Sequence, residues 1–212
     1  MPDVLVRTAA NRRMLADFFD SLDDSGLDSP SLCDAWTVRE VLAHLTMPFL
    51  VDLKGLIWRA VRARGSLDRA SESIAAELAT RPVGELTKVL RDHAEERVPA
   101  PGVGPMGQMA DGCLHLRDCA RPLGLADDVS VADWRMVLDW LPTRQASRGV
   151  VPKGRLDGLA LRSTDQDWAW GSGAAVEGSS EALAMAVSGR AVALDDLTGP
   201  GVQTLRVRLV GG

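Results

Sequence analysis

The sequence lacks the features that mark membrane, nucleic-acid-binding and disulfide-rich proteins. No apolar run reaches the roughly 18 residues that a membrane-spanning helix needs, and the longest, residues 45–56, is broken by Pro48, Asp52 and Lys54. Three cysteines are an odd number, at spacings that indicate no disulfide framework. A net charge of −5 at pH 7 leaves no excess of basic residues for phosphate contacts. We therefore expect neither a membrane nor a nucleic-acid partner.

The amino terminus also lacks a secretory signal. Met1-Pro2-Asp3 is not followed by a basic region and an apolar core, so we expect a protein of the reducing cytoplasm. With 46% hydrophobic and 25% charged residues, the composition is that of a globular protein. A length of 212 residues is enough for one large domain or two small ones.

Apolar residues recur at helical intervals over the first two-thirds of the chain. A Thr37-x-x-Glu40 capping box opens one helix, which Pro48 kinks or ends because a mid-helix proline loses a hydrogen bond. Ser130 caps another helix. The expected helices cover about residues 4–22, 38–65, 67–79, 85–96, 108–121 and 131–141. This alternation predicts a helical bundle of four or five main helices over residues 1–143.

The pattern changes near Pro142, where polar, arginine-rich and glycine-rich sequence begins. Strands are expected at 159–164 and 167–173, a helix at 179–188, and a half-buried terminal strand at 205–210, where apolar residues alternate with arginine. Residues 144–212 are therefore expected to form a small α/β domain. The predicted fold is therefore mainly α, a helical bundle followed by this small domain; the family resemblance given below implies an up-and-down four-helix bundle.

Three acidic and imidazole groups share one face of the helix expected at 108–121. At about 100° per residue, Asp111, His115 and Asp118 lie within about 60° of one another. Asp111 and His115 are one turn apart, a spacing at which both can bind the same ion. The same spacing also fits a simpler interpretation, in which Asp118 pairs with Arg117 or Arg121 and His115 is a partly exposed histidine.

His44 offers a third ligand if its helix packs alongside. It lies within an apolar stripe, where a hydrogen-bonded core histidine is the commoner explanation. Two imidazoles and one carboxylate leave an open position on a divalent metal, as in catalytic rather than structural sites. Alternatively, His44, Asp111 and His115 form a structural hydrogen-bond cluster without metal.

Other candidate motifs carry less chemistry. Gly102-x-Gly104-x-x-Gly107 matches a dinucleotide fingerprint as a string, but Pro105 and the missing strand argue against that interpretation. Cys113 and Cys119 are expected to be small core residues. Cys33 lies in the loop before the capping box and could approach the histidines. His93 lies in a charged turn that we expect to be exposed.

Two runs of sequence carry a family resemblance. Trp-Thr-Val-Arg-Glu-Val-Leu-Ala-His-Leu at 36–45 and His-x-x-Asp-x-x-Arg-Pro-Leu-Gly at 115–124 resemble the mycothiol-dependent maleylpyruvate isomerase family, within the DinB-like superfamily. Thr-Asp-x-Asp-Trp at 164–168 and Ser-Gly-Arg at 188–190 are similar to that family's second domain. The resemblance spans essentially the whole chain.

The resemblance implies a DinB-like four-helix bundle that holds a divalent metal, commonly zinc. It assigns the ligands to His44, Asp111 and His115. The family usually has glutamate where this chain has Asp111, and the shorter aspartate must lie closer to the metal or bind through water. Asp118 then acquires a role, since metal-bound imidazoles usually donate their other N–H to a carboxylate. An actinobacterial setting with mycothiol as the thiol co-substrate is also implied.

The implied activity is isomerisation or S-transfer on a small electrophilic molecule, with a metal-bound thiolate as nucleophile. Arg190, after the helix at 179–188, is expected to bind the thiol or the substrate, unless it is only a surface arginine near a helix end. Two other hypotheses remain open: a metal-dependent hydrolase, and a non-catalytic small-molecule-binding or stress-response protein on the same scaffold. Either a monomer or a homodimer is expected.

Overall fold

The computed structural model describes residues 4–33, 36–52, 67–98, 102–126 and 129–210. Within it the chain divides into two compact units. The first comprises Met1–Val98 and His115–Asp128, and the second comprises Pro99–Leu114 and Val129–Gly212. Helix α7 (Pro105–Ala120) runs through both units, and each unit is described by itself.

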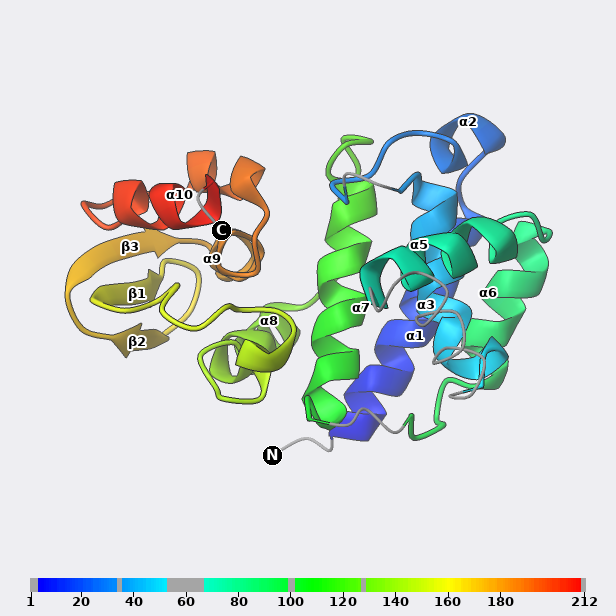
Figure 1. Ribbon diagram of the computed structural model, residues 1–212, viewed down its shortest axis with the longest axis horizontal. Helices are drawn as coiled ribbons and strands as arrows, with labels where there is room; N and C mark the ends of the chain where they lie inside the picture. Colours follow the sequence, from blue (N-terminus) through cyan, green and yellow to red (C-terminus); the bar gives the residue numbers. More distant parts are fainter. Residues whose placement is uncertain (1–3, 34–35, 53–66, 99–101, 127–128, 211–212) are drawn as a thin grey trace. The chain divides into compact units, whose positions relative to one another are not determined.

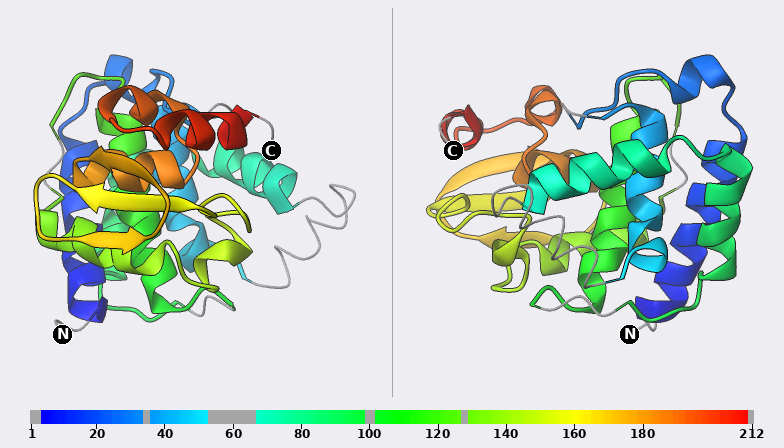
Figure 2. Two further views of the ribbon diagram at one scale, coloured as in Figure 1. Left: turned by 90° about the vertical axis from the view of Figure 1, so that its left-hand side faces the viewer. Right: turned by 45° about the vertical axis from the view of Figure 1, so that its right-hand side comes forward.

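The first unit is helical. Its helices, besides the end of α7, are α1 (Val4–Asp20), α2 (Asp24–Leu27), α3 (Val38–Leu50), α5 (Leu67–Leu78) and α6 (Val83–Asp92). Helix α6 packs against α1 and α3, and α5 packs against α3 (Figure 1). The right-hand view of Figure 2 shows α1 and α6 side by side. Fully buried side chains between these helices include Leu15, Phe19, Leu42, Ile74, Leu86 and Leu90.

The predicted capping box begins α3. The Glu40 N–H donates to the Thr37 hydroxyl, and the Thr37 N–H donates to the Glu40 carboxylate at 2.8 Å. Pro48 lies inside the last turn of α3, which ends at Leu50. The predicted continuation of this helix to residue 65 lies outside the described residues from 53 onward.

The second unit contains a small sheet covered by helices. Its strands are β1 (Leu159–Ser163), β2 (Ala169–Gly171) and β3 (Ala174–Gly178), in the order β2-β1-β3. Strand β1 is antiparallel to β2 and parallel to β3. Its helices, besides the start of α7, are α8 (Val131–Trp140), η1 (Ala146–Arg148), α9 (Ser180–Val187), η2 (Ala191–Asp196) and α10 (Val202–Val210). Helix α9 packs on β1, β3 and α8 (Figure 1).

These elements confirm the predicted fold class, a mainly helical protein with a small α/β unit at the carboxyl end. That the bundle has four main helices, and that the domains divide between residues 143 and 144, stay predictions. Within the described residues, none of the helices has the length and the apolar character needed to cross a bilayer.

The turn between β2 and β3 depends on glycine. Gly173 has a φ of +128°, and a Cβ atom there would clash with the carbonyl oxygen of Gly158. The next residue, Ala174, donates its N–H to that same oxygen at 2.9 Å. Only a residue without a side chain allows the chain to approach β1 this closely.

The prediction of a terminal strand at 205–210 is wrong, because these residues belong to α10. In a strand, Leu205 and Val207 would face the same side. The structure buries Leu205 completely and leaves Val207 61% exposed, as expected for residues about 200° apart on a helix. β1 pairs with β2 on one side and with β3 on the other, and the sequence pattern did not predict β3.

Candidate metal centre

His44 lies on α3, whose apolar residues Val41, Leu42 and Leu45 are buried. The His44 side chain is half-buried, and its ring lies against the Trp36 indole, with ring centroids 4.6 Å apart. The Oγ atom of Ser71, on α5, is 3.3 Å from its Nδ1 atom. This contact engages the Nδ1 atom of the His44 ring.

The three predicted metal ligands come together. Asp111 and His115 lie one turn apart on α7, and the His44 and His115 rings meet edge to face at 5.0 Å. One candidate ligand atom from each of His44, Asp111 and His115 lies within 4.8 Å of the other two. Metal binding itself remains a prediction.

Asp118 contacts His115 as the metal hypothesis requires. Its Oδ2 atom is 3.0 Å from the Nδ1 atom of His115, and its side chain is completely buried. A carboxylate in this position holds the ring proton on Nδ1 and so presents the lone pair of Nε2. The sequence alone allowed two interpretations of Asp118, this role and an ion pair with a neighbouring arginine.

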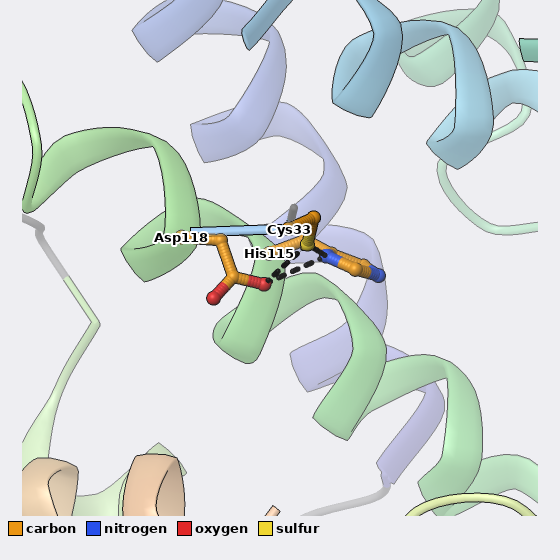
Figure 3. A group of neighbouring side chains, drawn as sticks. All are labelled: Cys33, His115 and Asp118. Carbon is orange, nitrogen blue, oxygen red and sulfur yellow. Dashed lines mark hydrogen bonds and ion pairs between the residues drawn. The ribbon is translucent and has the colours of Figure 1, made fainter. Parts of the chain in front are cut away.

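Cys33 lies beside His115 and Asp118, although the sequence indicated no role for it. Its Sγ atom lies 3.2 Å from Oδ2 of Asp118, to which the thiol donates, and 3.6 Å from Nδ1 of His115 (Figure 3). The backbone N–H of Leu32 donates to the Asp118 carbonyl oxygen at 2.9 Å, which ties the Cys33 loop to α7. No local pattern indicates this contact, because more than 80 residues separate its partners.

Trp36 closes another side of the histidine pair. Its ring centroid lies 6.1 Å from that of His115 as well as beside His44. Among the described residues, its indole Nε1 is a buried donor with no hydrogen-bond partner. Since buried donors are nearly always satisfied, an acceptor on a bound molecule would complete this arrangement.

The donor set fits a divalent transition metal. Two imidazole nitrogens and one carboxylate oxygen suit zinc and its neighbours, and three protein ligands leave a position for a substrate. The shorter side chain of Asp111 does not remove its carboxylate from the group. The orphaned N–H of Trp36 beside the same two rings is a second observation in favour of a ligand here.

The remaining candidates lie elsewhere. Arg190 follows α9 and donates from Nη1 to the Ser188 carbonyl oxygen at 3.1 Å, so its predicted role toward thiol or substrate stays a prediction. His93 bonds to the exposed Glu96 and stacks on Phe49, as part of the partly exposed turn after α6.

Cys113 and Cys119 are both fully buried, as predicted. Burial raises the pKa of the Cys119 thiol well above its ordinary value, and the nearby carboxyl of Asp118 adds to this effect. Cys119 is therefore a neutral core residue rather than a reactive thiol.

Comparison with known proteins connects this geometry to a family. Residues 8–107 match the sequence profile of the mycothiol maleylpyruvate isomerase N-terminal domain. The match includes His44 and ends before Asp111 and His115. A search of the curated proteins finds no significant match.

Two solved structures share the fold. One is the mycothiol-dependent maleylpyruvate isomerase, at 13% identity and a TM-score of 0.56, and the other is a histidine-to-alanine mutant of that enzyme, at 14% and 0.58. Each alignment covers 93% of this chain and 91% of the other. The family match over residues 8–107 and this shared fold together support the resemblance to the mycothiol-dependent maleylpyruvate isomerase family.

Proposed function

We propose that this protein is a metal-dependent, mycothiol-using isomerase or S-transferase that acts on small electrophilic molecules. The observation that carries the proposal is the convergence of His44, Asp111 and His115, whose ligand atoms lie within 4.8 Å of one another. We propose that these three residues hold a divalent metal, with zinc the metal that this donor set favours.

The chain's own residues prepare this site. Asp118 accepts the Nδ1 proton of His115 and so holds that ring with Nε2 toward the site. The Ser71 hydroxyl, 3.3 Å from Nδ1 of His44, restrains the His44 ring. A divalent metal, when bound, lowers the pKa of a thiol and so supplies a thiolate nucleophile at neutral pH.

Trp36 is suited to position the electrophile. Its buried indole N–H donates to an oxygen of the bound molecule, and its ring, beside His44, shields that part of the site from water. Addition of the thiol and its later departure gives isomerisation, whereas retention of the thiol gives S-transfer. We further propose a cytoplasmic monomer or homodimer from an actinobacterial setting, where mycothiol is the available thiol.

The test is a thiol-dependence assay. The zinc-loaded protein is incubated with maleylpyruvate, and with a panel of small electrophiles, in the presence and absence of mycothiol. The proposal expects turnover that requires the thiol and is lost in the His44→Ala variant. His93→Ala is the matched control, because it removes a histidine outside the ligand group, and it should keep full activity.

Other outcomes favour the rival functions. Ester or amide hydrolysis that needs the metal but no thiol would identify a hydrolase with an activated water. Tight binding of the thiol without turnover of any electrophile would identify a non-catalytic binding protein. Either result would overturn the proposed activity.

A further inference from the structure

We propose that Cys33, Asp118 and the Nδ1 atom of His115 form a second cation site, for a soft, thiophilic divalent ion such as cadmium. This inference goes beyond the proposed function, since it uses a different donor set and the other nitrogen of His115.

The spacing of the donor atoms suits a tetrahedral ion. The three pairs of atoms are separated by 3.0 Å (nitrogen to oxygen), 3.2 Å (sulfur to oxygen) and 3.6 Å (sulfur to nitrogen). Zinc bonds of about 2.0 to 2.3 Å at tetrahedral angles place such donors roughly 3.3 to 3.6 Å apart, and a larger soft ion places them somewhat further apart. The three atoms are therefore close enough together for small shifts of the side chains to bind one ion.

Burial and position also suit a cation. Asp118 is completely buried, and the side chain of His115 is 10% exposed, so two of the three donors are already held away from water. An ion beside the buried carboxylate compensates its negative charge. Cys33 is only partly buried.

The sulfur ligand sets the selectivity. A thiolate, an imidazole and a carboxylate bind soft and borderline ions, whereas magnesium and calcium prefer all-oxygen sites. The group of His44, Asp111 and His115 contains no sulfur. A soft ion such as cadmium therefore prefers the Cys33 site, whereas zinc, a borderline ion, suits the two imidazoles and the carboxylate of that group.

The two sites exclude each other, because they share His115. A neutral imidazole has one nitrogen with a free lone pair and one that carries a proton. When an ion binds Nδ1, the Cys33 thiol gives its proton to the solvent, and the ring proton moves from Nδ1 to Nε2 by exchange with water. His115 is then withdrawn from the group with His44 and Asp111, so a thiophilic ion disables that group.

Cadmium titration of the metal-free protein tests the proposal. Bound thiolate gives an ultraviolet charge-transfer absorption, which we expect to saturate at one equivalent of cadmium. The absorption should disappear in Cys33→Ala and remain in the matched controls Cys113→Ala and Cys119→Ala. It should also remain in His44→Ala, so that failure of the proposed function and failure of this site are distinguishable.

Several results would overturn the proposal: no charge-transfer absorption in the unsubstituted protein, its survival in Cys33→Ala, or its loss in either buried-cysteine control. Circular dichroism establishes that each variant is folded. If Cys33→Ala does not fold, Cys33→Ser replaces it, because a serine oxygen preserves the size of the side chain and cannot give the sulfur band.

Discussion

The Nδ1 atom of His115 lies 3.0 Å from Oδ2 of Asp118, a residue without exposed surface, one helical turn further along α7. This contact fixes which nitrogen of His115 faces the group that it forms with His44 and Asp111. The proposed metal chemistry therefore depends on a residue that is not itself a ligand of that group. The metal affinities in the next two predictions are measured in a Cys33→Ala background, so that the proposed site of Cys33, Asp118 and His115 does not contribute to them.

Replacing Asp118 should weaken metal binding without removing a ligand of the His44 group. We expect Asp118→Ala to lower the affinity for zinc by about 10- to 100-fold, because the His115 ring loses its orientation and basicity. Competition with a chromophoric chelator measures this affinity. Asp92→Ala removes an exposed carboxylate that pairs with Lys88, and it should leave the affinity unchanged. Equal affinity in both variants would contradict the role of Asp118.

Metal binding should tolerate a longer carboxylate at position 111 better than the loss of the carboxylate. Asp111→Ala leaves two imidazoles, so the zinc affinity should fall by at least about 10-fold, whereas Asp111→Glu keeps the charge and the helical position and should retain bound zinc. Isothermal titration with zinc distinguishes the two variants. Wild-type affinity in Asp111→Ala would remove Asp111 from the ligand set.

Arg12 fastens the end of α6 to α1 and is expected to matter for stability. Its guanidinium lies 4.9 Å above the Phe49 ring, and burial lowers its pKa. Its Nη1 atom donates to three backbone carbonyl oxygens, those of His93, Ala94 and Glu96.

Arg12→Met removes these donors while keeping much of the apolar side chain. We expect the free energy of unfolding to fall by about 2 to 4 kcal/mol, because one buried and two partly buried carbonyl groups lose their charged partner. Urea denaturation measures the loss. Arg13→Ala breaks only the exposed pair with Glu95 and should cost about 0 to 1 kcal/mol. A loss for Arg12→Met no larger than for this control would show that the contacts contribute little.

Asp165 should make the stability of the second unit fall at acid pH. Its burial acts to raise its pKa, but hydrogen bonds from Ser163 and from the hydroxyl and N–H of Ser180 outweigh this and lower the pKa. A carboxyl whose pKa is lower in the folded state contributes stability above its unfolded pKa. That contribution is lost as the pH falls through the folded value.

Urea denaturation between about pH 3 and pH 6 tests this linkage, since an unfolded aspartate titrates near pH 3.9. We expect the unfolding free energy of Asp165→Asn to fall less steeply in acid than that of the unsubstituted protein. Asp195→Asn, which changes an exposed carboxylate paired with Arg206, serves as the comparison. Identical acid slopes for Asp165→Asn and the unsubstituted protein would rule out the contribution of Asp165.

Local side-chain chemistry was predictable from the sequence. The hydroxyls of Thr37 and Ser130 accept backbone N–H groups three residues later, so their position before an apolar run predicts where α3 and α8 begin. The one-turn spacing of Asp111 and His115 follows from helical geometry in the same way.

Contacts between distant segments were not predictable. Cys33 meets Asp118 because the Leu32 backbone bonds to α7, and no spacing within either segment encodes that bond. Residues 205–210 alternate like a strand, yet β3 pairs with β1 and the segment folds as α10 instead. Alternation alone does not distinguish a short strand from a short helix that buries a single leucine.

The metal content of His44→Ala tests the central claim most directly. In the Cys33→Ala background, after reloading with zinc and removal of excess metal, elemental analysis should find about one equivalent in the parent and in His93→Ala, the histidine control. His44→Ala, folded by circular dichroism, should retain well under half an equivalent. A full equivalent of zinc in His44→Ala, or none in the parent, would contradict a metal centre built on His44, Asp111 and His115.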